Sequence, residues 1–108
     1  MKSVDTTEMA DLIRRCFDLS MDGRVSPQQR SALVAAGKRL RGDLVTLLAA
    51  RFDDQTAEVD AANQDLASVN VSLQASAADL GKLGQTLRKL TAVVSKIDSL
   101  IPMIAKAV

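Results

Sequence analysis

Oxygen-bearing side chains stand at alternate positions in a short segment that follows the first apolar pattern of the chain. Asp18, Ser20 and Asp22 are each separated by one residue, and Gly23 comes directly after them. Carboxylate and hydroxyl oxygens are the ligands that a calcium ion prefers, and a glycine allows the sharp turn that wraps a loop around the ion. This segment is therefore the first place where the sequence could do chemistry.

The same segment resembles the first half of the calcium-binding loop of the EF-hand family. Asp18, Ser20 and Asp22 match the first, third and fifth positions of that loop, and Val25 matches its apolar eighth position. Gln29 stands at the twelfth position, where the family has a bidentate glutamate. The resemblance implies weak calcium binding at most, so we expect an ordinary turn between two helices, with no metal and no other cofactor.

The composition argues against catalysis and against nucleic acid as a partner. The 108 residues include no histidine, no tryptophan and no tyrosine, and the single cysteine, Cys16, lies among apolar residues. Without histidine the chain lacks the commonest general base and a usual zinc ligand. The formal net charge of +1 gives no overall attraction to nucleic acid. The first eleven residues are polar and acidic and no apolar run is long enough to span a bilayer, so we expect a cytoplasmic protein.

Two helix-start signals occur in the first third of the chain. Asp5 and Glu8 have the spacing of a capping box, and Ser26 precedes Pro27 and a second such box. The sequence predicts one helix that runs to about Asp18 and another that begins at Pro27. We expect this pair to form a short head over residues 5–44 of a single helical domain, 1–108.

A seven-residue repeat of apolar side chains begins at Val45 and continues to the last residue. A companion row follows three residues later and is interrupted at Gln55 and Ser76. Two such rows form the seam of a coiled coil. The sequence therefore predicts a coiled-coil region over 45–108 whose interface residues are Val45, Leu48, Phe52, Val59, Leu66, Val69, Leu73, Leu80, Leu83, Leu87, Leu90, Val94, Ile97, Ile101 and Ile104.

Two architectures satisfy this repeat. The region 45–108 could be one uninterrupted helix, about 95 Å long at 1.5 Å per residue. It could also fold back as a hairpin near 76–84, where weak helix formers and a further capping-box pattern occur. We predict an all-α fold with an elongated heptad coiled coil of one of these kinds. A compact bundle in which short heptad runs mark core faces is the alternative.

The repeat also determines the expected function. We predict a non-enzymatic assembly protein that self-associates, or binds a helical partner, through the heptad seam. An alternative follows from residues 93–108, where the apolar face widens and Lys96 and Lys106 flank it: a helical protein that associates with a membrane. A third possibility, a degenerate calcium binder, depends on the Asp18 segment alone.

Overall fold

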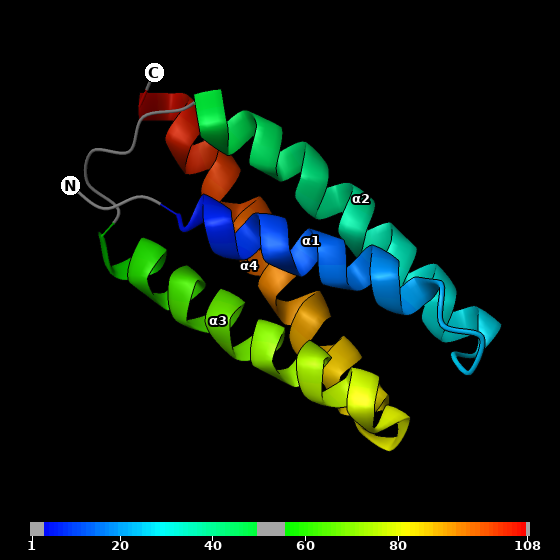
Figure 1. Cartoon of the computed structure of the whole chain (residues 1–108). Coiled ribbons are helices and arrows are strands. Elements are labelled where there is room, and N and C mark those ends of the chain that lie inside the picture. The colour runs from blue at the N-terminus through cyan, green and yellow to red at the C-terminus, as the bar shows by residue number, and fades with distance from the viewer. Residues whose placement is uncertain (1–3, 50–55, 108) are drawn as a thin grey trace.

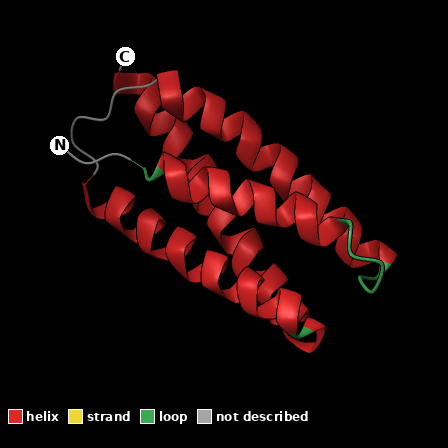
Figure 2. Cartoon of the chain, in the orientation of Figure 1, coloured by secondary structure: helices red, strands yellow, loops and turns green. Residues whose placement is uncertain are grey.

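The described part of the chain is helical almost throughout. The computed structural model describes residues 4–49 and 56–107, with side chains placed at 4–48 and 57–102. Its helices are α1 (Thr6–Ser20), α2 (Pro27–Ala49), α3 (Thr56–Ala78) and α4 (Leu83–Ala107), and a 3-10 turn, η1 (Leu80–Lys82), lies between the last two. No strand occurs in these two ranges (Figure 2). The prediction of an all-α fold is confirmed.

The first two helices begin where the sequence predicts. Asp5 accepts a hydrogen bond from the Glu8 amide at 3.0 Å and caps α1. The hydroxyl of Ser26 accepts one from the Gln29 amide at 3.2 Å and caps α2. Both contacts satisfy an amide that has no partner inside the helix. The Glu8 carboxylate does not complete its capping box, because it accepts a hydrogen bond from Asn70 on α3 instead.

The helices form a bundle of two antiparallel hairpins, α1–α2 and α3–α4 (Figure 1). α1 packs beside α2 and α3, and α4 packs beside α3 and α2. The neighbours α1 and α3 run in the same direction, as do α2 and α4 (Figure 1). α2 and α3 lie on a diagonal of the bundle and make no contact with each other. The outer faces of α2 and α3 therefore point to opposite sides of the molecule.

Each helix contributes one apolar face to a common core. The main buried residues of each face are spaced three, four or seven residues apart, the spacing that packs helices nearly parallel to one another. These residues are Met9, Leu12, Cys16 and Leu19 in α1, Leu33, Gly37, Leu40 and Leu47 in α2, Val59, Ala62, Leu66, Val69, Leu73 and Ser76 in α3, and Leu83, Thr86, Leu90, Val93, Ile97 and Leu100 in α4. Burial raises the pKa of the Cys16 thiol to about 12, so this side chain serves as a small core residue.

The predicted uninterrupted helix over 45–108 is wrong. α3 ends at Ala78 and α4 begins at Leu83, which places a turn inside the 76–84 segment of the hairpin alternative. Asp79 caps this turn by accepting a hydrogen bond from the Gly81 amide at 3.0 Å. The bundle measures 43 × 20 × 18 Å, far less than the length of the predicted rod. The physical reason is that α3 and α4 cover each other's apolar faces within one chain.

The core face changes its phase at the connections between helices. In α3 it occupies the two predicted seam rows, which contain Val59 and Ala62. In α4 it occupies the rows of Leu83 and Thr86. The predicted row of Leu83 is kept, and the row of Thr86 takes the place of the predicted row of Leu80 and Leu87. The turn between the helices permits this rotation, because a loop ends the helical phase and the next helix begins with its own.

The predicted boundary between a head and a heptad region falls inside a helix. α2 is continuous across residues 44 and 45, and both Leu44 and Leu47 pack in the same core as α1. Residues 5–44 and the described part of 45–108 thus share one apolar core.

Candidate interaction surface

Most of the predicted interface residues on α3 and α4 are covered by the chain's own helices. Buried among them are Val59, Leu66, Val69, Leu73, Leu83, Leu90 and Ile97, and half-buried are Leu80, Leu87, Val94 and Ile101. Phe52 and the side chain of Ile104 lie outside the described residues. Val45 and Leu48, both on α2, are exposed by 66% and 67%. Of the predicted seam, this α2 pair is the part that the bundle leaves in solvent.

Val45 and Leu48 are exposed because α2 turns a different face to the core. Its buried row contains Leu33, Leu40 and Leu47, which lies two residues after the predicted row of Val45 and one residue before the row of Leu48. An exposed face of α2 is here called the α2 outer stripe. It consists of Ser31, Val34, Ala35, Lys38, Arg41, Gly42, Val45 and Leu48, and Val34 alone among these is half-buried.

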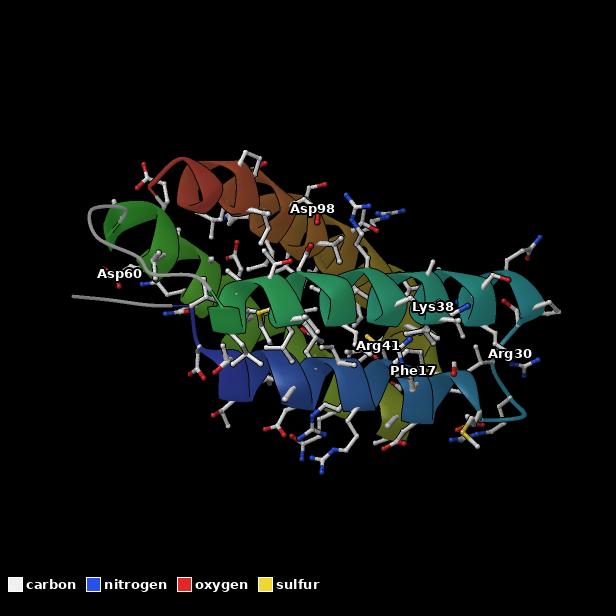
Figure 3. The ribbon with its side chains drawn as sticks, turned by 90° about the horizontal axis from the view of Figure 1, so that it is seen from above. Phe17, Arg30, Lys38, Arg41, Asp60 and Asp98 are labelled. Atoms are coloured by element: carbon white, nitrogen blue, oxygen red, sulfur yellow. The ribbon has the colours of Figure 1, made fainter. Side chains whose placement is uncertain are left out.

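A shallow, open depression of about 480 Å³ lies on the first half of the α2 outer stripe. Its lining comes from one face of α2 alone and consists of Arg30, Ser31, Val34, Ala35 and Lys38. Arg41 follows Lys38 one turn later along the helix (Figure 3). The stripe therefore presents a depression, then positive charge, then two large apolar side chains.

The basic residues of α2 differ in their contacts. Arg30 donates to the backbone carbonyls of Ser20, Asp22 and Val25, at 2.8, 3.3 and 3.2 Å, so its guanidinium holds the α1–α2 loop closed. The Arg41 guanidinium lies 5.7 Å from the centre of the Phe17 ring on α1, within the range of a cation–π contact. Because Arg30 and Arg41 are engaged in contacts within the chain, the basic side chains of α2 do not form one cluster that is available to bind phosphate groups.

A pair of carboxyl groups joins α2 to α4. Asp43 lies beside Asp98, and Arg39 Nε donates to both Asp98 oxygens at 3.1 and 3.0 Å. Partial burial and the neighbouring Asp98 raise the pKa of Asp43 to about 7. Burial would raise the pKa of Asp98 too, but hydrogen bonds from Asp43 and Arg39 outweigh it and lower that pKa. Sequence reasoning missed this cluster, because its members lie on separate helices without a shared motif.

The exposed face of α3 differs from that of α2 in charge and in size. The α3 outer face consists of Ala57, Glu58, Ala61, Gln64, Ser68 and Val71, of which Ala61 is half-buried. Val71 is exposed by 67% and is, with Met21, Val45 and Leu48, one of the exposed large apolar side chains in the described part of the chain.

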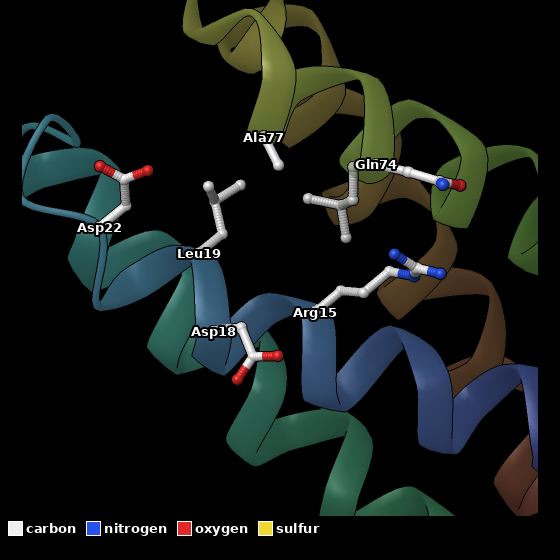
Figure 4. Close-up of a pocket in the computed structure, with 7 residues that line it drawn as sticks. Arg15, Asp18, Leu19, Asp22, Gln74 and Ala77 are labelled. Atoms are coloured by element: carbon white, nitrogen blue, oxygen red, sulfur yellow. The ribbon is translucent and has the colours of Figure 1, made fainter.

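The loop that resembles half an EF-hand does not gather its oxygens around one point. Asp18 is exposed in the last turn of α1, and the Ser20 hydroxyl donates to the Phe17 carbonyl at 2.6 Å. The Asp22 carboxylate is held by Arg24 through side-chain contacts of 3.0 and 2.7 Å, which lower the pKa of Asp22 to about 2. The Asp18 and Asp22 carboxylates point to different sides beside a pocket of about 250 Å³ (Figure 4). Among the described residues no three His, Cys, Asp or Glu side chains are grouped as metal ligands.

Polar residues in and beside the predicted heptad rows join helices inside the chain. Asn63 Oδ1 accepts from the Asp5 amide at 2.7 Å, and Asn70 Nδ2 donates to the Glu8 carbonyl at 3.0 Å. Both contacts connect α3 to the beginning of α1. Ser76, where the companion row fails, lies 2.7 Å from the hydroxyl of Thr86 in the buried space between α3 and α4.

The apolar face expected to meet a membrane takes part in the bundle. Val93, Ile97 and Leu100 are buried, and the side chains of residues 103–108 lie outside the described part. α4 contains Pro102 and continues to Ala107. Within the described ranges, no helix combines the length and the apolar character needed to cross a bilayer.

Comparisons with known proteins add no assignment to this geometry. The chain matches no family model, no curated protein and no solved structure.

Proposed function

We propose that this chain is a non-enzymatic helical assembly protein of the cytoplasm that self-associates through the α2 outer stripe. The observation that carries the proposal is the exposure of Val45 and Leu48, 66% and 67%, on one side of a helix whose other side is buried. Adjacent exposed apolar side chains within a polar rim are typical of protein interaction sites. Scattered single apolar residues would not support the same conclusion.

The contact we propose is a pair of helices packed as in a coiled coil. Positions 34, 38, 41, 45 and 48 alternate in steps of four and three, so one partner helix could follow the whole stripe. α2 has 23 residues and is about 34 Å long. With helices about 10 Å apart, such a contact buries on the order of 700 Å² in total, below the ~1,200 Å² of a standard stable interface. We therefore expect weak association, with a dissociation constant on the order of 0.1 mM.

Sedimentation velocity between about 10 µM and 1 mM, which brackets that constant, tests the proposal. We expect the mean mass of the wild-type chain to rise with concentration. Val45→Gln/Leu48→Gln should remain at the mass of one chain, because glutamine removes the apolar contact but is a good helix former. Met21→Gln is the matched control, because Met21 is exposed by 82% on the loop, away from the stripe. It should associate like the wild type.

Three outcomes would overturn the proposal. The first is a wild-type chain that remains at one-chain mass up to the highest concentration. The second is a Val45→Gln/Leu48→Gln variant that still associates, provided that its helical circular dichroism signal and unfolding midpoint match those of the wild type. The third is binding to anionic lipid vesicles that the double variant loses while no self-association is found, which would assign the stripe to a membrane surface.

A further inference from the structure

We infer that copies associate head to tail, with the α2 outer stripe of one copy packed on the α3 outer face of the next. This inference rests on the proposed function, because it names the surface that the stripe contacts. Its basis is the different charge and shape of the two faces and their positions on opposite sides of the bundle.

The two helices are opposite in charge. α2 carries Arg30, Lys38, Arg39 and Arg41 against one acidic residue, Asp43. α3 carries Glu58, Asp60 and Asp65 and no basic residue, and Asp65 forms an ion pair with Lys96 on α4. On the faces themselves, Lys38 and Arg41 are exposed in the α2 outer stripe, and Glu58 is exposed in the α3 outer face. Faces of opposite charge favour each other as partners and steer their encounter.

Pairing of the stripe with the same stripe of a second copy is disfavoured by the same charges. In an antiparallel pair centred on the helix, Lys38 of one copy would face Lys38 of the other, and the two Arg41 side chains would lie about one turn to either side. Four cations would meet with no carboxylate on the stripe to compensate them, since Asp43 is turned toward Asp98. Like charges brought together across an interface oppose association.

The order of features along the two helices fits an antiparallel contact. The depression around Val34 lies in the first half of α2, and the exposed Val71 lies in the second half of α3. Antiparallel helices bring these halves together. With Val71 beside Val34, the same orientation sets Lys38 near Ser68, Arg41 against Gln64 and Val45 near Ala61. A parallel contact would instead place the α2 cations beside Val71.

The placement of the two faces determines the kind of assembly. α2 and α3 lie on a diagonal of the bundle, so a copy bound through its α3 face still presents its α2 stripe on the far side (Figure 1). A contact between two different faces closes into a ring only if its rotation allows, and otherwise adds copies in an open series. We therefore expect the mass to rise past two chains without a plateau as the concentration increases.

Two blocked variants and their mixture provide the test. An α2 variant, Lys38→Gln/Val45→Gln/Leu48→Gln, removes the charge and the apolar contacts from the stripe and leaves α3 unchanged. An α3 variant, Glu58→Lys/Val71→Lys, reverses the charge of the α3 face and leaves α2 unchanged. All five positions are exposed, so we expect both variants to keep the wild-type helical signal and unfolding midpoint.

Each variant alone should sediment as one chain at concentrations where the wild type associates. An equimolar mixture should form a two-chain particle and grow no further, because it combines one intact α2 stripe with one intact α3 face. A mixture that remains at one-chain mass while the wild type associates would overturn the head-to-tail contact and leave the proposed function standing. Self-association of the α3 variant alone would also overturn it. A wild type that never associates would remove both proposals.

Discussion

The α1–α2 and α3–α4 hairpins bring their helices together by different contacts. In α1–α2 the tip of the Phe17 ring lies against Gly37, and Arg30 ties down the loop carbonyls. In α3–α4 the connection is one short turn, and Ser76 and Thr86 share a buried hydroxyl contact. The predicted seam is buried along α3 but lies in solvent on α2. The seven-residue apolar repeat therefore identifies one face of a helix. Whether that face is buried depends on where the neighbouring helices pack.

The largest effect on stability is expected when a leucine is truncated to alanine at a buried position on α4, compared with the same truncation at an exposed position on α2. Leu90 on α4 is 1% exposed, and Leu90→Ala should lower the free energy of unfolding by about 2 to 5 kcal/mol, because it leaves a cavity in the core. Leu48→Ala on α2 should change it by less than about 0.5 kcal/mol. Urea denaturation at low protein concentration measures both. Equal losses would mean that Leu48 is covered within the single chain.

The close approach in the α1–α2 hairpin gives the next largest effect. A Cβ atom at position 37 would lie 2.9 Å from the Phe17 ring, whereas one at Gly42, on the same helix, would meet nothing within 4 Å. Gly42→Ala should stabilise the chain by about 0.5 to 1 kcal/mol through helix propensity. We expect Gly37→Ala to be about 1 to 3 kcal/mol less stable than Gly42→Ala, because the ring must move. Thermal unfolding of the two variants compares them directly, and equal gains would show that Phe17 yields without cost.

The buried hydroxyl contact of the α3–α4 hairpin should have a smaller effect. Thr86→Val keeps the side-chain shape and removes its hydroxyl from Ser76, so the free energy of unfolding should fall by about 1 kcal/mol. Thr91→Val is the control, because the Thr91 hydroxyl is exposed and bonds the Leu87 carbonyl on its own helix. It should remain within about 0.5 kcal/mol of the wild type. A Thr86→Val chain as stable as the control would deny this contact any role in joining the hairpin.

The contact between the two hairpins should respond to pH. The pKa of Asp43 is raised from 3.8 to about 7, so the folded chain keeps a proton there that the unfolded chain releases. The stability that this proton contributes is full below about pH 4, falls as the pH rises toward 7, and then levels off. Asp43→Asn keeps a donor toward Asp98 without titrating, so its unfolding midpoint should change less over this range than that of the wild type. Midpoints measured from pH 4 to 8 provide the comparison.

A control at another carboxylate makes this last prediction specific. Glu58→Gln also removes one carboxylate, but at an exposed position outside the Asp43–Asp98 cluster. It should keep the wild-type dependence on pH between 4 and 7. If Asp43→Asn follows the wild type just as closely, Asp43 is ionised in the folded chain throughout that range.

Sequence reasoning predicts the helices better than their arrangement. The cap at Asp5 and the start at Pro27 are local signals, because a hydrogen bond to the nearest free amide depends on a few neighbouring residues. The face of α3 follows from its own repeat. The exposure of Val45 does not, because its row continues in phase across the connection although α2 turns another face to the core. No local pattern records that Leu33, Leu40 and Leu47 pack on α1 and α4.

The same limit explains the polar residues. Ser76 interrupts the predicted heptad row, and its hydrogen-bond partner Thr86 lies across a turn that the heptad repeat does not predict. Asn63 and Asn70 stand beside the predicted seam, and the structure places them between α3 and the start of α1. Asp43 and Asp98 are far apart in sequence. Tertiary packing alone brings each of these pairs together.

The burial of Cys16 has a practical consequence for studying this chain. With no tryptophan or tyrosine, the protein has almost no intrinsic fluorescence to follow, but it has one thiol, fully enclosed in α1. A thiol reagent can modify that sulfur only when α1 separates from its neighbours, so the labelling rate reports how often the helix opens. The labelling rate of Cys16 can therefore be measured for every variant named above and compared with that of the wild type.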